Sequence, residues 1–484
     1  MKAGPNKYES TLESLRTHVA PPWYDEAKLG IFVHWTPASV IGFAPREKEI
    51  TELLLERYDD MQVDVPYTEW YENSLRFPHS SASQYHREHY GEKPLAAFAE
   101  DFKRAVAERW DPEAWADDFA AAGARYVVLV TKHHDGFCLW PSRVPHPTRA
   151  GWHTQRDAVG ELARAVRERG IRFGVYYSGG LDWTFDARPI ANIGDLIAAA
   201  PGGRYPRYAD AHFRELIERV RPDVLWNDIS WAGDKRSLLR LFADYYNEIP
   251  DGLVNDRWTP VFPLGRLMRL AFLRNRFNAR VKAAVLRNGG GLQPPPGLHC
   301  DTRTPEYTTF SDVRPEKWEC VRGIDKSFGF NRASLPHDFL SREALIHSLV
   351  DIASKNGNLL LNVGPRGEDA QIPEPQRERL RWLGRFTKRY GEALYGTKPW
   401  TRAEGETVEG IPLRFTARGD TVYAWLMGNP GEPASIELLG IRAESARLVG
   451  GAPLALERNE RGTRVALPAL PDEPAHAIAL SGVR

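Results

Sequence analysis

The chain has 484 residues, a length that predicts two to four domains, or one barrel with an accessory module. Lys and Arg together number 64, and Asp and Glu also number 64, so the formal net charge is zero. This balance provides no global field for polyanions, and we therefore expect neither nucleic acid nor an anionic membrane surface as a partner.

The cysteines and the N-terminus bear on the compartment. Cys138, Cys300 and Cys320 are few, odd in number and without a CxxC spacing, which indicates neither a disulfide framework nor a zinc ribbon. The first residues lack the apolar stretch of a secretory signal, and no run of about 18 apolar residues could span a bilayer. We expect a soluble, cytoplasmic protein.

From residue 29 to residue 364, short apolar strands alternate with amphipathic helices, a pattern typical of parallel strands joined by right-handed crossovers. The strands are predicted at 30–34, 125–131, 171–177, 223–226, 252–255 and 358–363, with 301–306 as a less regular candidate. Helices are predicted at 111–122, 158–169, 209–220, 236–247 and 342–354. This order predicts an α/β fold with a TIM-like (β/α) barrel.

Polar residues end most of these strands, as in His34, His133-His134-Asp135, Tyr176-Tyr177, Asn227-Asp228 and Asn255-Asp256-Arg257. In a barrel the carboxyl ends of all strands share one face, whereas a doubly wound sheet gathers polar groups at a single switch point. The distribution favours the barrel. No Gly-x-Gly-x-x-Gly or Walker loop follows a strand, so we expect no nucleotide cofactor.

The segment 259–300 is basic and apolar and contains no acidic residue. We favour an inserted helix packed over the barrel rim with solvated arginines. The alternative is an amphipathic helix on a membrane or partner surface, and a lid over the barrel mouth also fits the position.

After a helix at 374–390 the pattern changes near Thr397 to Trp400. Short alternating segments at 411–416, 421–427, 434–439, 445–449, 464–467 and 477–480 predict an antiparallel β-sandwich. We therefore divide the chain into a catalytic barrel domain, 1–398, and a C-terminal β-sandwich domain, 399–484.

Two acids at strand ends are candidates for chemistry. Asp228 follows a short apolar strand and lies between Trp226 and Trp231, and Glu306 lies beyond the basic insertion. Two carboxyl groups among aromatic side chains are what glycoside hydrolysis requires. Asp228 could equally be structural, and Glu306 could be a surface acid paired with Arg303.

The adjacent His133 and His134 allow two interpretations. They could ligate a metal, but neighbours on an extended backbone point in opposite directions, and neither His-x-His nor His-Glu-x-x-His is present. Neutral imidazoles at a barrel mouth would suit sugar hydroxyls, with His34 as a third. Glu69 and Trp70 offer a carboxylate beside an aromatic surface, or else a helix start.

Several motifs occur in order along the chain: Gly30-Ile31-Phe32-Val33-His34-Trp35, Glu69-Trp70-Tyr71, Lys132-His133-His134-Asp135-Gly136-Phe137, Phe173-Gly174-Val175-Tyr176-Tyr177-Ser178, Leu225-Trp226-Asn227-Asp228, Asn255-Asp256-Arg257-Trp258, Trp318-Glu319, Ser327-Phe328-Gly329 and Leu361-Asn362-Val363-Gly364-Pro365. The set resembles the α-L-fucosidases of glycoside hydrolase family 29, over roughly residues 20–395.

The resemblance implies a (β/α) barrel with a C-terminal β-sandwich, and retaining, exo-acting hydrolysis of terminal α-L-fucosides without a metal or organic cofactor. Asp228 matches the nucleophile, and Glu306 matches the acid/base through Thr304-Pro305-Glu306-Tyr307. The residues that match sugar-binding positions are His34, Glu69, Trp70, His133, His134, Tyr176 and Arg257, while Phe32, Trp226 and Phe328 match the wall around the sugar's C6 methyl group.

Tyr177 rather than Tyr176 could face the pocket, and we expect drier surroundings for Glu306 than for Asp228 because an acid catalyst must start protonated. The implied partner is a fucosylated glycoside, and a homo-oligomer is compatible with the sequence. The alternatives are an inactive carbohydrate-binding barrel, a glycosidase acting on a fucose-like sugar such as a β-D-galactoside, and metal-dependent hydrolysis at His133 and His134.

Overall fold

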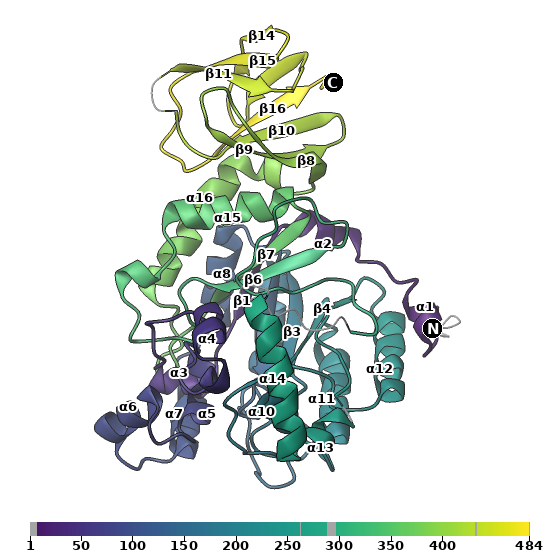
Figure 1. Ribbon diagram of the computed structural model, residues 1–484, viewed down its shortest axis with the longest axis vertical. Coiled ribbons are helices and arrows are strands. Elements are labelled where there is room, and N and C mark those ends of the chain that lie inside the picture. The colour runs from purple at the N-terminus through teal and green to yellow at the C-terminus, as the bar shows by residue number, and fades with distance from the viewer. Residues whose placement is uncertain (1–6, 262, 288–296, 431–432, 484) are drawn as a thin grey trace.

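A computed structural model describes residues 7–261, 263–287, 297–430 and 433–483. Its centre is a parallel seven-stranded sheet in the order β5-β4-β3-β2-β1-β7-β6 (Figure 1). The strands are β1 (Leu29–Val33), β2 (Tyr126–Lys132), β3 (Arg172–Ser178), β4 (Val224–Asp228), β5 (Leu253–Val254), β6 (Trp318–Gly323) and β7 (Gly357–Val363). All are buried almost throughout, as expected for a parallel sheet covered on both faces.

Residues 301–307 connect the two edges of this sheet. The Asp301 N–H donates to the Val254 carbonyl of β5 at 3.0 Å, and the Tyr307 N–H donates to the Val321 carbonyl of β6 at 3.0 Å. Arg303 and Glu306 form parallel bridges with β6. The segment therefore takes the place of an eighth strand, and the sheet curls into the predicted TIM-like barrel.

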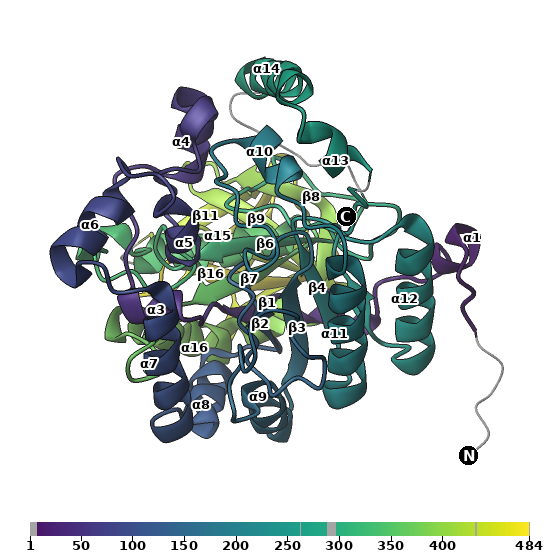
Figure 2. The same ribbon diagram turned by 90° about the horizontal axis from the view of Figure 1, so that it is seen from below.

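Helices surround the barrel (Figure 2). The Asp111 side chain caps α8 by accepting from the N–H groups of Glu113 and Ala114, and Gly123 ends the helix with a φ of 87°. The predicted helices are confirmed as α8 (Pro112–Ala122), α9 (Ala158–Glu168), α11 (Tyr205–Val220), α12 (Lys235–Glu248), α15 (Arg342–Ser354) and α16 (Glu374–Leu394).

Further short elements precede or interrupt the barrel, most of them in the long connection between β1 and β2. They are α1 (Leu12–Leu15), α2 (Pro22–Ala27), α3 (Ala38–Ile41), α4 (Ile50–Glu56), η1 (Tyr58–Asp60), η2 (Thr68–Trp70), α5 (Tyr71–Ser74), α6 (Ser81–Tyr90), α7 (Leu95–Glu108), α10 (Ile193–Ala198) and η3 (Pro336–Asp338).

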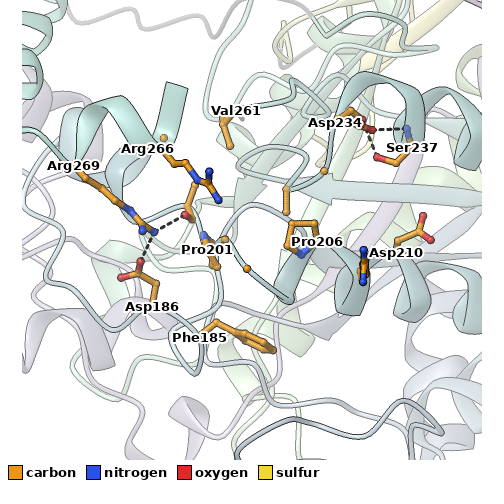
Figure 3. Close-up of a pocket in the computed structure, with 17 residues that line it drawn as sticks. Phe185, Asp186, Pro201, Pro206, Asp210, Asp234, Ser237, Val261, Arg266 and Arg269 are labelled. Atoms are coloured by element: carbon orange, nitrogen blue, oxygen red, sulfur yellow. Dashed lines mark hydrogen bonds and ion pairs between the residues drawn. The ribbon is translucent and has the colours of Figure 1, made fainter. Parts of the chain in front are cut away.

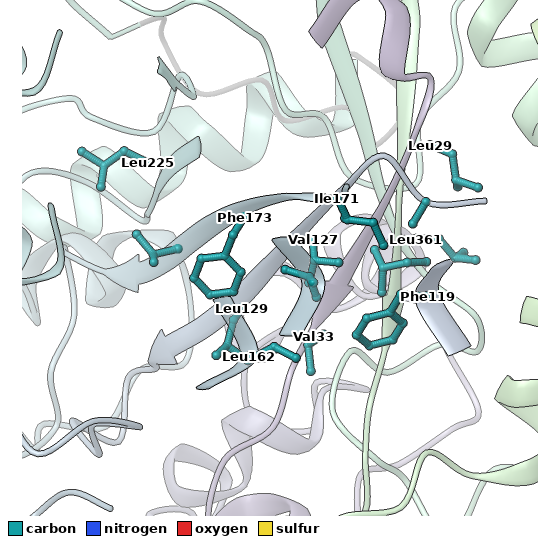
Figure 4. Packing of buried hydrophobic residues seen from close by; sticks show 14 of the residues in the cluster. Leu29, Val33, Phe119, Val127, Leu129, Leu162, Ile171, Phe173, Leu225 and Leu361 are labelled. Atoms are coloured by element: carbon teal, nitrogen blue, oxygen red, sulfur yellow. The ribbon is translucent and has the colours of Figure 1, made fainter. Parts of the chain in front are cut away.

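Alternation along the strands divides the core into two layers. Side chains such as Val127, Phe173 and Leu225 point outward and pack against the helices, as Figure 4 shows. Their neighbours Val128 and Trp226 belong to a separate cluster inside the barrel. Burying each large apolar side chain stabilises the fold by about 1.5 to 3 kcal/mol, so a one-residue slip of a strand would exchange both layers at great cost.

The inserted segment forms α13 (Leu264–Met268) and α14 (Ala271–Arg287). Helix α14 lies beside α10 and α4 at the barrel rim (Figure 2). Arg274 pairs with Asp195 at 2.9 Å, and Val285 is buried against α4. Packing over the rim is confirmed, although Arg274 is paired instead of solvated. Residues 288–296 of the insertion lie outside the described residues.

The C-terminal region consists of two antiparallel sheets, in the orders β13-β12-β16-β10-β9-β8 and β11-β15-β14, which confirms the predicted β-sandwich. Its strands are β8 (Lys398–Glu406), β9 (Pro412–Arg418), β10 (Thr421–Leu426), β11 (Ala434–Leu439), β12 (Ser445–Leu448), β13 (Pro453–Leu454), β14 (Leu456–Arg458), β15 (Gly462–Leu467) and β16 (His476–Ser481).

The sandwich and the barrel share a hydrophobic core. Phe386 and Tyr390 of α16 contact Trp425 of β10, and the Tyr390 hydroxyl lies 2.8 Å from Nδ1 of His476. Lys355 at the end of α15 pairs with Glu404 of β8 at 2.7 Å. In the described parts of the chain, no helix is both long enough and apolar enough to cross a membrane.

Candidate active site

The residues that sequence reasoning selected converge at the carboxyl ends of the barrel strands, the face that carries chemistry in such folds. Asp228 is the last residue of β4, and Tyr176 lies near the end of β3. The others follow β1, β2, β5 and β6 or belong to the connections between strands: His34, His133, His134, Arg257, Glu306, Phe328, Glu69 and Trp70.

Asp228 accepts three hydrogen bonds. The Tyr176 hydroxyl donates to Oδ2 at 2.7 Å, while Nη1 of Arg257 and the Ile229 N–H donate to Oδ1 at 3.0 and 2.8 Å. Burial acts to raise the pKa of Asp228, but the Arg257 charge and these hydrogen bonds outweigh it and lower the pKa below its ordinary value. Asp228 is therefore held as a carboxylate in a buried site.

Ile229 has a φ of 67°, a left-handed conformation that a β-branched residue rarely adopts. The conformation directs its N–H to the Asp228 carboxylate, and the Asp228 carbonyl accepts from the N–H of Gly180 at 3.2 Å and of Ser230 at 2.9 Å. Strain of this kind persists where surrounding contacts enforce it, and it clusters at functional sites.

Arg257 also contacts Glu306. Its Nη2 lies 2.7 Å from Oε1 of Glu306, so one guanidinium bridges the two carboxyl groups. Arg257 is itself fixed by Thr304, whose carbonyl accepts from Nη2 at 2.9 Å. Arg303 instead faces Asp256 at 3.9 Å, so the alternative pairing of Glu306 with Arg303 is wrong.

The expectation of drier surroundings for Glu306 is also wrong. The Glu306 side chain is 30% exposed, against 12% for Asp228. The reason is position, because Asp228 ends a central strand whereas Glu306 lies on the irregular segment at the open edge of the barrel mouth.

Three histidines line the site. Nδ1 of His34 lies 2.5 Å from Oδ1 of Asn362, and Nδ1 of His134 lies 2.6 Å from the Ser178 hydroxyl. Nδ1 of His133 is buried without a hydrogen-bond partner among the described residues. Burial lowers the pKa of His34 to about 4 and lowers the pKa of His133 and His134 well below the ordinary value. All three imidazoles are therefore neutral near pH 7.

His133 and His134 do not point in opposite directions as expected, because β2 ends at Lys132 and the two residues lie beyond the strand. Their ring centres are 4.0 Å apart. Ligand atoms of His133, His134 and Asp228 lie within 4.8 Å of one another, as do those of His34, Glu69 and His133. The Arg257 cation on Asp228 opposes a metal in the first of these groups.

Glu69 lies in η2, so both sequence interpretations hold, a short helix and a carboxylate facing the site. Its Oε2 accepts from the Gly329 N–H at 2.9 Å. Burial raises the pKa of Glu69 to about 7. The neighbouring Trp70 packs edge-on against His134, with ring centres 5.1 Å apart.

Aromatic rings form one side of the site. The ring of Trp226 lies 5.3 Å from that of Phe32 and 5.2 Å from that of Tyr176, and Phe328 stacks on His34 at 5.0 Å. Tyr177 points the other way, into the core between barrel and helices, where its hydroxyl meets His212 at 3.0 Å. Tyr176 is therefore the residue that faces the site.

Sequence reasoning assigned no role to Asn362, Thr304 or Ser178, which fix His34, Arg257 and His134. A signal existed for Asn362, which is a polar residue near the end of a strand like the other site residues. Ser178 carries the same signal, as the last residue of β3, whereas Thr304 lies on the irregular segment 301–307, where no strand end marks it.

A separate cavity of about 690 Å³ opens on the same barrel face, between the β3–α11 and β4–α12 connections and α13. Figure 3 shows Arg269, the residue after α13, at one end of the cavity, where it forms an ion pair with Asp186 at 3.0 Å, and Asp234, which caps α12, at the other end. Asp228 and Glu306 are not among its lining residues.

Comparisons with known proteins identify the family of this chain. The family model described as "Alpha-L-fucosidase" matches residues 1–264 and 272–392. The tissue alpha-L-fucosidase of Bos taurus is 30% identical, over 99% of this chain and 92% of that protein. The alpha-L-fucosidase of Branchiostoma floridae is also 30% identical, over 88% of this chain and 82% of its own.

Solved structures give the same result. A structure titled "alpha-L-fucosidase" has a TM-score of 0.83 and 39% identity, covering 98% of this chain and all of that one. The Thermotoga maritima alpha-fucosidase in complex with fucose has a TM-score of 0.79 and 38% identity, again over 98% of this chain and 100% of that chain. The chain belongs to the α-L-fucosidase family, glycoside hydrolase family 29.

Proposed function

We propose that this protein removes terminal α-L-fucose from fucosylated glycosides by double displacement, with Asp228 as nucleophile and Glu306 as general acid/base. The observation that carries the assignment is the Arg257 guanidinium that bridges Asp228 and Glu306 at the barrel mouth. A retaining glycosidase needs two carboxyl groups close together, one ionised to attack and one able to exchange a proton.

In the first step an oxygen of Asp228 forms a bond to C1 of fucose while the bond from C1 to the leaving oxygen breaks. Glu306 donates its proton to that oxygen. In the second step water gives a proton to Glu306 and its oxygen attacks C1, which releases Asp228 as a carboxylate. The hydrogen bonds from Tyr176 and Ile229 keep Asp228 ionised for the first step.

The neutral histidines support recognition of the sugar hydroxyls. A neutral imidazole offers one donor and one acceptor, so each ring can use its free nitrogen toward a hydroxyl. Ligand atoms of His34, Glu69 and His133 lie within 4.8 Å of one another, and the ring edge of Trp70 packs against His134.

Phe32, Trp226 and Phe328 support selection of the deoxy sugar. Fucose carries a methyl group where galactose carries a hydroxymethyl group, and an aromatic wall leaves the extra hydroxyl without a partner. We expect this to cost about 1 to 3 kcal/mol, which disfavours β-D-galactosides without excluding them.

Two further expectations belong to this proposal. The cysteines Cys138, Cys300 and Cys320 are free thiols, which supports a reducing, cytoplasmic location. Cys138 is buried in the core and fits the packing role expected for it.

The assignment is tested with Asp228→Gly on an aryl α-L-fucoside. Hydrolysis should be lost, and azide should restore turnover as a fucosyl azide of inverted configuration relative to the substrate. Unimpaired hydrolysis by the variant would overturn the role of Asp228. Fucose binding by the wild type without turnover would select the inactive binding protein, and loss of activity with a chelator would select metal-dependent hydrolysis.

A further inference from the structure

Glu319 of β6 is a completely buried carboxyl group inside the barrel, and it has no role in the mechanism above. Its Oε1 accepts from Nε1 of Trp226 at 3.2 Å. Its Oε2 accepts from the Tyr24 hydroxyl at 2.8 Å and also from the Tyr126 hydroxyl. Three donors from three separate parts of the chain thus meet on one side chain.

A carboxyl group in this position is costly. Burial raises the pKa of Glu319, and apolar residues of similar volume fill barrel interiors without that penalty. The three hydrogen bonds offset part of the cost, and the one with a consequence for the site is the bond to Trp226. Trp226 precedes Asp228 by two residues, so both side chains point into the barrel from β4.

The Trp226 ring supports the two side chains that hold the nucleophile. The Tyr176 ring stacks on it at 5.2 Å with an angle of 24° between the planes, and the Arg257 guanidinium lies 4.7 Å from its centre. Tyr176 and Arg257 each donate to Asp228, and Arg257 also contacts Glu306. Rotation of the indole would therefore displace both donors.

We propose that Glu319 is a positioning residue for the fucosidase reaction, because it fixes the edge of the Trp226 indole and thereby orients Tyr176 and Arg257 toward Asp228. The inference rests on the proposed function. Glu319 touches neither substrate nor the reacting atoms and acts only through Trp226. A displacement of catalytic groups by about 1 Å, caused by a change at a residue outside the reacting centre, can lower the rate on the order of a hundredfold.

The test compares Glu319→Leu with Glu319→Gln and with Tyr24→Phe. Leucine leaves the indole N–H without an acceptor, so kcat/KM should fall between tenfold and roughly a hundredfold, mainly in kcat. The acidic limb of the pH profile should move to higher pH, since Asp228 loses well-placed donors. Glutamine keeps an acceptor oxygen and should recover most of the activity.

Tyr24→Phe is the matched control, because it removes a donor from the same carboxyl group but leaves the Trp226 bond intact. Its pH profile should equal that of the wild type even if its melting temperature falls. If Glu319→Leu loses activity with an unshifted pH profile, Glu319 is only structural and the inference is overturned.

If Glu319→Leu does not fold, Trp226→Phe replaces it. This variant lacks the indole N–H while keeping an aromatic ring between Tyr176 and Arg257, and the same shift of the acidic limb is expected. An unshifted limb would overturn the inference. A wild type that hydrolyses no α-L-fucoside would contradict the proposed function itself, which separates the two failures.

Discussion

Nη2 of Arg257 lies 2.7 Å from Oε1 of Glu306, and the other terminal nitrogen of the same guanidinium contacts Asp228. The two carboxyl groups therefore share one cation in the free protein. For Glu306 to donate a proton, the leaving oxygen of the substrate has to approach it, and the ion pair with Arg257 has to open. Arg257 then remains on Asp228 and keeps that group ionised.

Arg257→Met should lower kcat/KM on the order of a hundredfold, the effect of removing a well-placed electrostatic donor. The Arg257 charge lowers the pKa of Asp228, so its loss should shift the acidic limb of the pH profile to higher pH. Arg257→Lys keeps a positive charge near Asp228 and should therefore show a smaller shift of the acidic limb than Arg257→Met. Arg276→Met, on the exposed face of α14, is the control and should behave as the wild type. If the acidic limb of the pH profile does not move in Arg257→Met, the prediction is contradicted.

Glu69→Gln should stabilise the protein at alkaline pH. Burial raises the pKa of Glu69 from 4.5 to about 7, so the folded state binds this proton more tightly than the unfolded chain. The stabilisation that this bound proton gives the folded state is complete below pH 4.5 and is lost as the pH rises through about 7. The variant should therefore gain up to about 3 kcal/mol at pH 8 and nothing at pH 4 in urea unfolding. An equal gain at both values would rule out ionisation as the cause.

Much of the fold follows from sequence because the central strands are buried on both faces and read as continuous apolar runs. The residues 126–131 are an example. Strand β6 was missed because Glu319 and Arg322 interrupt such a run, and Glu319 finds its partners Tyr24 and Tyr126 only in three dimensions.

The site also has a part that the sequence predicts and a part that it does not. The rule that polar residues at strand ends share one barrel face placed His34, Tyr176 and Asp228 correctly on that face. The surroundings of Glu306 could not be predicted, because they depend on a contact with Arg257 across the inserted segment. The sequence also could not decide whether Tyr176 or Tyr177 faces the barrel interior, because this depends on how β3 is aligned with the neighbouring strands of the sheet.

Asn362→Leu should weaken fucose binding while changing stability little by comparison. The Asn362 amide donates to the Phe328 carbonyl, so its Oδ1 accepts from Nδ1–H of His34 and leaves Nε2 of that ring as an acceptor. Leucine removes this constraint on the tautomer. KM should rise roughly tenfold or more with a smaller change in kcat, because the lost contact binds the substrate and the transition state equally. A selective fall in kcat would show that the residue acts on the chemical step instead.

Asp351→Asn should destabilise the barrel and the sandwich together. Asp351 of α15 pairs with Lys355 at 2.7 Å and with Arg414 of β9, and the Lys355 side chain is only 3% exposed. Removing the charge leaves a buried ammonium with Glu404 as its remaining acid, at a cost of about 1 to 3 kcal/mol. Because Phe386 and Trp425 belong to one core, urea unfolding followed by fluorescence and by activity should show one coincident transition at a lower midpoint. Two separated transitions would mean that the shared core does not couple the barrel to the sandwich.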